Sequence, residues 1–254
     1  MMISITSGKG GVGKTSFAVN LALALSPEYR VLLVDADLGL ANVDVMLSLA
    51  PQVTVRHVLL EGRSVKAAVV KSGYGFDILP AASGVVELVQ PDSEMRGALE
   101  LGLQELANEY DLLLFDTGAG ISPVVLWFNC LAAYSLVIYT PEPTSITDAY
   151  ALIKVLSRDY GQKNFLLLAN QASEKEGEQY YAHLSRVINH YLGLSPYFLG
   201  SIPKDPELER SIRLQKPLLA HKRESKAARA ILKIAEELKP FLQKEPLKAA
   251  ARGV

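Results

Sequence analysis

Gly8-Lys9-Gly10-Gly11-Val12-Gly13-Lys14-Thr15 fits the pattern G-x-x-x-x-G-K-[ST], which forms a nucleotide phosphate-binding loop. The apolar segment 2–6 before it predicts a buried strand, and Phe17, Leu21 and Leu25 after it recur at helical spacing. In a strand-to-helix turn, glycines let successive backbone N–H groups point at phosphate oxygens, and the helix N-terminus adds partial positive charge. A chance glycine turn is the alternative. It is disfavoured because a predicted strand, a glycine-rich loop and a predicted helix follow one another in the order that a phosphate-binding loop requires.

This loop predicts binding of a nucleoside triphosphate or diphosphate together with Mg²⁺. The Lys14 ammonium is expected to reach the β- and γ-phosphates, and the Thr15 hydroxyl is placed to ligate the magnesium ion. The residues expected to bind the nucleotide here are Gly8, Lys9, Gly10, Gly11, Val12, Gly13, Lys14, Thr15 and Ser16.

Acidic and amide side chains follow three other apolar segments, at the edge of a parallel sheet where ligands bind. After segment 31–34, Asp35 can hold the water shell of magnesium and Asp37 can orient an attacking water. Asp116 closes segment 112–115 as a further magnesium partner, and Asn170 follows segment 165–169 with an amide suited to an adenine edge. The alternative is that these side chains only cap the helices that follow the strands.

Apolar strand segments alternate with helical periodicity along the chain, which indicates an α/β fold with a doubly wound, mostly parallel sheet between helices. We expect one domain over residues 1–243 and a flexible tail at 244–254. The expected strands are 2–6, 31–35, 76–79, 112–116, 136–140, 165–169 and 197–202, and the expected helices after the first are 93–110, 145–156, 174–192 and 225–242.

The amino-acid composition excludes several classes of protein for this chain. The formal net charge of -1 argues against a general nucleic-acid coat, although residues 204–252 hold 13 Lys+Arg and 7 Asp+Glu. The single cysteine, Cys130, excludes a disulfide framework and a cysteine-based metal site within one chain, and its apolar neighbours predict an inert core thiol. With neither a signal peptide nor an apolar stretch of membrane-spanning length recognisable, the expected compartment is the cytoplasm.

Lys9, directly after the first glycine, gives the variant K-G-G-V-G-K-T, which resembles the loop of the MinD and ParA family of ATPases. The segments 35–44, 80–84, 116–121, 142–154 and 168–171 are more specifically similar to the flagellar-number ATPases of that family, FlhG or FleN. This resemblance implies an eight-stranded sheet and slow ATP hydrolysis that depends on an ATP-bound homodimer.

The resemblance also implies residue roles and partners. Lys9 would reach the partner's nucleotide, Asp37 would position water, Asp116 would act as a switch, and Glu142 would touch the partner's nucleotide. The residues expected to border adenine are Asn170, Pro203 and Asp205. The implied partners are a flagellar transcription activator of the FleQ type, an FlhF-type GTPase or a basal-body component, with no direct contact to nucleic acid.

Departures from the family pattern limit these expectations. Members that stimulate the GTPase carry a glutamine- and arginine-containing motif before the first strand, and this sequence begins at that strand. The segment after Leu242 has few bulky apolar residues, so membrane contact is expected to be weak, with at most a peripheral location at the inner membrane or the cell pole. A division-site MinD and a DNA-partition ParA remain alternative functions, whereas the lone cysteine argues against a redox ATPase.

Overall fold

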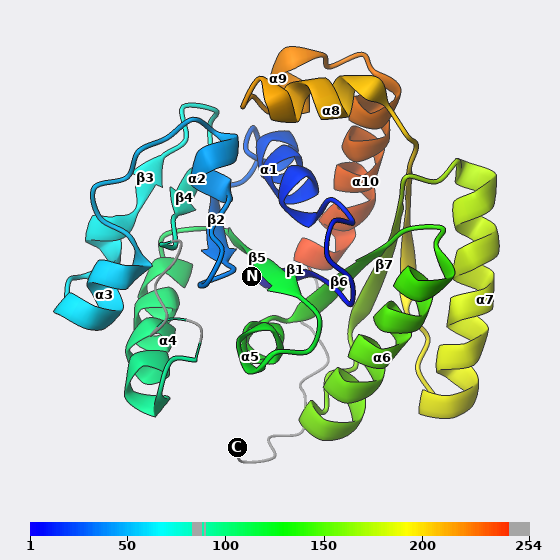
Figure 1. Ribbon diagram of the computed structural model, residues 1–254, viewed down its shortest axis with the longest axis horizontal. Coiled ribbons are helices and arrows are strands. Elements are labelled where there is room, and N and C mark those ends of the chain that lie inside the picture. Colours follow the sequence, from blue (N-terminus) through cyan, green and yellow to red (C-terminus); the bar gives the residue numbers. More distant parts are fainter. Residues whose placement is uncertain (83–87, 89, 244–254) are drawn as a thin grey trace.

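A computed structural model describes residues 1–82, 88 and 90–243. Its centre is an eight-stranded sheet with the strand order β3-β4-β2-β5-β1-β6-β7-β8 (Figure 1). All neighbouring strands are parallel except the pair β3 and β4. The strands are β1 (Met2–Ser7), β2 (Val31–Ala36), β3 (Val70–Lys71), β4 (Asp77–Leu79), β5 (Leu112–Ala119), β6 (Tyr134–Tyr139), β7 (Phe165–Asn170) and β8 (Tyr197–Ile202).

Helices cover both faces of the sheet (Figure 1). On one face α1 and α10 pack against apolar side chains of β1, β2, β5, β6, β7 and β8. On the other face α3 to α7 pack against the apolar side chains that point to the opposite side of the sheet. The helices are α1 (Lys14–Leu25), α2 (Val43–Met46), α3 (Val55–Glu61), the 3-10 helix η1 (Val65–Ala68), α4 (Ser93–Ala107), α5 (Pro123–Leu131), α6 (Pro143–Tyr160), α7 (Glu174–Leu192), α8 (Pro206–Arg213), α9 (Leu218–His221) and α10 (Lys226–Leu242).

The central strands are buried from end to end, because helices cover them on both sides. β2, β6 and β7 have no half-exposed residue, which explains why their sequences are continuous apolar runs without alternation. Because these strands run parallel, the carboxyl ends of β1, β2, β5 and β7 lie at one edge of the sheet, beside the start of α1 (Figure 1).

The predicted fold class is confirmed, and every expected strand and helix is present with boundary shifts of a few residues. The sequence-based prediction missed β3, η1 and the short helices α2, α3, α8 and α9, because elements of two to eight residues carry little periodic signal. It also missed α5, although Ser122 caps this helix and Pro123 occupies its first turn.

Two further expectations concern the cysteine and the C-terminal tail. Cys130 is exposed, so its expected place in the core is wrong: it is the last but one residue of α5, where the helix turns its side chain away from the sheet. The expected tail at 244–254 lies outside the described residues. Among the helices that the structure describes, none is long and apolar enough to span a bilayer.

Candidate functional site

The phosphate-loop motif forms the connection between β1 and α1, as the sequence predicts. Gly11 and Gly13 have φ values of 75° and 92°, in the left-handed region that glycine adopts without strain. A Cβ atom on Gly13 would lie 2.6 Å from the side-chain nitrogen of Asn170, whereas one on Gly10 or Gly11 would meet no atom within 4 Å. The loop is therefore packed on its Asn170 side and open at its tip.

Lys14, at the first position of α1, points back along the loop toward β1. Its ammonium donates to the Ser7 hydroxyl at 3.0 Å, and that hydroxyl donates to the Lys9 carbonyl at 2.7 Å. Burial lowers the pKa of Lys14, and the carboxylates of Asp116 and Asp37 oppose this shift. Ser7 was missed by the sequence-based prediction, although it directly precedes the motif.

Asp35 and Asp116 lie side by side on the neighbouring strands β2 and β5, in register with each other. Both are almost fully buried, at 1% and 2% exposure. Burial raises the pKa of Asp35 well above its usual value, with a further contribution from the charge of Asp116. Burial also raises the pKa of Asp116, to about 7, although the Thr15 hydroxyl donates to it. The pair therefore favours holding a proton near neutral pH.

The Asp35 carboxylate anchors the loop that follows β2. One oxygen accepts from the backbone N–H groups of Asn42 and Val43 at 3.0 and 3.1 Å, and the other accepts from the N–H of Asp37 at 3.3 Å. Residues 37–42, which we call the Asp37 loop, are therefore fixed at both ends to one buried side chain. Both carboxylate oxygens of Asp35 thus accept hydrogen bonds from backbone N–H groups.

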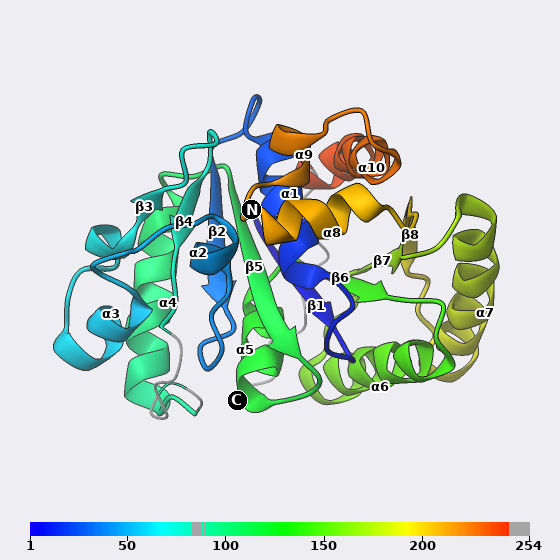
Figure 2. The ribbon, with the colours of Figure 1, turned by 45° about the horizontal axis from the view of Figure 1, so that its top comes forward.

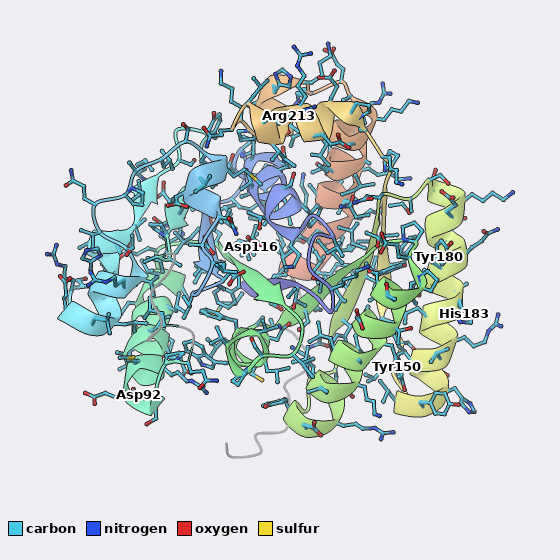
Figure 3. All side chains as sticks on the ribbon, in the orientation of Figure 1. Asp92, Asp116, Tyr150, Tyr180, His183 and Arg213 are labelled. Carbon is cyan, nitrogen blue, oxygen red and sulfur yellow. The ribbon has the colours of Figure 1, made fainter. Side chains whose placement is uncertain are left out.

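Asp37 itself is half-buried and faces a cavity of about 780 Å³. The cavity is bordered by Lys14 and Thr15 on one side and by the small residues 117–119 on another. Burial raises the pKa of Asp37, while N–H groups of Leu40 and Gly39 and the charge of Lys14 oppose the shift. The structure thus brings Lys14, Thr15 and Asp37 together, with Asp116 just behind Thr15 at the centre of the molecule (Figure 3).

Lys9 extends from the tip of the loop to the start of α6. Its ammonium forms an ion pair with Glu142 and donates to the Thr144 hydroxyl at 3.0 Å. The Lys9 and Glu142 side chains are 37% and 60% exposed. The α6 backbone also packs tightly on the loop, since a Cβ on Gly8 would lie 2.2 Å from the backbone of Asp148. The two residues implied in contacts across a dimer are therefore joined at the surface of one chain.

The residues expected to border adenine lie at the ends of β7 and β8, outside the large cavity. Asn170 donates to the Val12 carbonyl at 2.7 Å and so contacts the phosphate loop. Asp205 caps α8 by accepting from the Glu207 N–H at 3.0 Å and also accepts from the Ala227 N–H of α10 at 2.8 Å. Pro203 borders a separate cavity of about 280 Å³ beside α10. Of these three residues, only Asn170 forms a hydrogen bond with the phosphate loop in the described structure.

The donor set suits a magnesium–nucleotide complex. Asp116 Oδ1 and the Ser16 hydroxyl are buried without a hydrogen-bond partner, and the Thr15 hydroxyl is adjacent to Asp116. No group of three His, Cys, Asp or Glu side chains in residues 1–82, 88 and 90–243 could hold a metal ion. Mg²⁺ typically keeps several waters and binds through one or two protein oxygens plus substrate phosphates, so this set fits that ion.

The family model of the CobQ/CobB/MinD/ParA nucleotide binding domain matches residues 3–218. The antiactivator FleN of Pseudomonas aeruginosa is 41% identical over 99% of this chain and 89% of its own length. The flagellum site-determining protein YlxH of Helicobacter pylori is 34% identical over 85% of this chain and 74% of its own. The Mg-ADP complex of the septum site-determining protein MinD from Pyrococcus horikoshii superimposes with a TM-score of 0.81 at 28% identity, over 95% of this chain and 97% of that one.

Proposed function

Because this chain belongs to the MinD/ParA family of nucleotide-binding ATPases, among its FleN and FlhG-type members, we propose that it is an ATP-dependent switch. In this proposal ATP closes a homodimer, slow hydrolysis opens it, and partner proteins of the flagellar system bind one of the two states. The observation that carries the proposal is that Lys14, Thr15 and Asp37 border one cavity above the phosphate loop.

Each residue around this cavity has a distinct part in the proposed hydrolysis. Lys14 would exchange its contact with Ser7 for phosphate oxygens, which solvate an ammonium more strongly than a hydroxyl does. Asp37 would accept a hydrogen bond from the attacking water and orient it toward the γ-phosphate. Thr15 and Asp116, with Asp35 in the outer shell, would hold Mg²⁺, which supplies charge neutralisation at the phosphates.

Lys9 supplies the proposed link between hydrolysis and dimerisation. Its ammonium is exposed at the loop tip and is paired with Glu142, which is itself largely exposed. An exposed ion pair contributes little to stability because water screens both charges, so Lys9 can leave Glu142 at small cost. In a face-to-face dimer it would then neutralise charge on the partner's transferring phosphoryl group, and Glu142 would be free to contact the partner's nucleotide.

The regulatory role follows from the relatives. FleN is named an antiactivator and YlxH a flagellum site-determining protein. We infer that this chain limits flagellar number or placement in the same way, by binding a transcription activator of the FleQ type, with an FlhF-type GTPase or a basal-body component as further partners. The expected location is the cytoplasm, with peripheral contact at the inner membrane or a cell pole.

Light scattering of the purified protein with ATP, with ADP and without nucleotide tests the switch. Asp37→Ala should bind ATP without hydrolysing it, because the variant lacks the group that orients water but keeps the phosphate contacts. It should therefore form a dimer with ATP, but not with ADP or without nucleotide. Lys9→Ala should remain a monomer with ATP. A dimer of equal strength in all three conditions would rule out the nucleotide switch.

A further inference from the structure

Gln215, in the turn between α8 and α9, joins this turn to the segment that follows the Asp37 loop. Its side-chain nitrogen donates to the Val45 carbonyl in α2 at 2.8 Å. Its side-chain oxygen faces the Ser48 hydroxyl, which donates to it at 3.4 Å. The contact spans 170 positions of the sequence, and it is one that neither periodicity nor the nucleotide motifs predict.

The backbone at this contact is strained on both sides. Gln215 has φ 51° and Ser48 has φ 55°, and these are two of the three non-glycine residues with positive φ in the described part of the chain. A residue with a Cβ atom is strained in the left-handed region and persists there where surrounding contacts determine it. Two such residues that meet in one hydrogen-bonded contact indicate a geometry that the fold holds in place.

The turn is also fixed to the helix that carries the phosphate-binding residues. The Leu219 N–H donates to the Asn20 side chain at 2.9 Å, and the Asn20 nitrogen donates to the Ser16 carbonyl at 2.7 Å. Asn20 is buried, at 1% exposure. Hydrogen bonds therefore join the first turn of α1 to α9, and the short segment of backbone between Leu219 and Gln215 continues this connection to α2.

The Asp37 loop and α2 are thus held from two directions. Asp35 binds the backbone of Asn42 and Val43, where α2 begins, and Gln215 binds Val45 two residues further along α2. Met46 of α2 and Ile212 of α8 both border the cavity that Asp37 faces. Figure 2 shows α8 and α9 crossing over α1 toward α2, which is the path of this connection.

We propose that Gln215 is a positioning residue for the Asp37 loop: by donating to Val45 it sets the loop relative to α1, the helix that carries Lys14 and Thr15. The kinetic consequence rests on the proposed ATP hydrolysis, because the loop holds the group that would orient water. The positional role itself requires only the described contacts. Gln215 does not touch the reacting atoms and acts through Val45.

Three variants separate the hydrogen bond from backbone and packing effects. Gln215→Gly keeps the positive φ without strain and removes the side chain. Gln215→Glu keeps the size of the side chain but replaces the donating amide with a carboxylate, which cannot donate to the Val45 carbonyl at pH 8. Lys216→Ala is the matched control, since this neighbouring side chain is exposed and forms no hydrogen bond or ion pair with the described part of the chain.

Hydrogen exchange of the nucleotide-free protein tests the positional role without any reference to ATP. In Gln215→Gly and Gln215→Glu, amides of residues 42–49 should exchange about 5-fold faster than in the wild type, which corresponds to the loss of one net hydrogen bond. Amides of the central strands should be unchanged, and Lys216→Ala should match the wild type. Unchanged exchange at residues 42–49 in both Gln215 variants would overturn the proposal.

Steady-state kinetics then test the consequence for the reaction. Both Gln215 variants should lower kcat about 3- to 10-fold and leave KM for ATP unchanged, because Asp37 is displaced while the phosphate contacts are intact. Wild-type kcat in Gln215→Glu would overturn the role of the donated hydrogen bond. If the wild-type protein hydrolyses no ATP, the proposed function fails, and the exchange experiment still decides the position of the loop.

Discussion

Asp35 and Asp37 are two residues apart in the sequence but have different environments. Asp35 is buried and its oxygens accept three backbone N–H groups, so it shapes the loop. Asp37 is half-buried, faces the cavity, and has the charge of Lys14 nearby. Only Asp37 is therefore placed to contact a water molecule beside the γ-phosphate.

Removal of the Asp37 carboxylate should affect ATP turnover but not ATP binding. Asp37→Ala should lower the turnover rate at least about 100-fold, the contribution of a positioned base, and leave ATP affinity within about 3-fold of the wild type. Lys14→Ala should abolish binding, because it removes the cation that contacts the phosphates. A phosphate-release assay and titration with a fluorescent ATP analogue measure the two properties. Asp159→Ala, at an exposed position on α6, is the control; wild-type turnover in Asp37→Ala would show that another group positions the water.

Asp116 predicts how stability depends on pH in the nucleotide-free protein. Its pKa is about 7 in the folded chain and about 4 when unfolded, so the folded state binds more protons between these values. The free energy of unfolding should therefore fall as pH rises from about 4 to about 7. Urea denaturation at pH 5 and pH 8 should show that this fall is smaller in Asp116→Asn, by on the order of 1–3 kcal/mol. An equal fall in both proteins would contradict the assignment to Asp116.

At the scale of elements, the contact between α7 and β8 depends on a missing side chain. A Cβ on Gly177 of α7 would lie 1.8 Å from the Ser201 hydroxyl and 3.2 Å from the Ala169 Cβ. Gly97 of α4 is a helical glycine with no atom within 4 Å of the same position. Gly177 and Gly97 both lie within α-helices, but only Gly177 is packed against a neighbouring element.

Substitution of Gly177 and of Gly97 by alanine should therefore change the free energy of unfolding in opposite directions. Gly177→Ala should lower the free energy of unfolding by about 1–3 kcal/mol, because α7 has to move away from the sheet. Gly97→Ala should raise it by about 0.5–1 kcal/mol, since alanine favours the helix and meets open space. Chemical denaturation of both variants checks the pair. If Gly177→Ala were as stable as Gly97→Ala, close packing of α7 on β8 would not hold α7 in place.

At the scale of the whole molecule, the charge distribution bears on the alternative function of DNA partition. The basic excess lies in the last fifth of the sequence, but several of its cations are paired within the chain. Lys233 pairs with Glu174, Lys239 pairs with Glu28 and Glu236, and Arg210 lies 3.9 Å from Glu207. Cations that are paired with carboxylates of the same chain are weaker partners for a phosphate backbone than free ones.

We therefore expect DNA affinity that does not depend on the nucleotide. Fluorescence anisotropy with a labelled duplex, at 50 and 200 mM salt and with ATP or ADP, measures it. The binding curves with ATP and ADP should coincide, because in the proposed function the dimer acts on proteins and not on DNA. ATP-dependent binding that weakens steeply between the two salt concentrations would favour the partition function instead.

The sequence by itself determined the fold class, the phosphate loop and the strand ends at which the acidic residues lie. It could do so because buried parallel strands are continuous apolar runs, and because their carboxyl ends meet at one edge of the sheet. The roles proposed for Lys14, Thr15, Asp37 and Asp116 all depend on this local pattern. Their positions around the start of α1 agree with it.

Only the tertiary structure decided which of these groups share an environment. The register of β2 and β5 places Asp35 beside Asp116 in the buried centre of the sheet, where burial raises the pKa values of both carboxyls. The packing of α6 joins Lys9 to Glu142. The contact of Gln215 with Val45 depends on short helices whose few residues carry no periodic signal. These features are set by contacts between residues far apart in the sequence, so they arise only when the chain has folded.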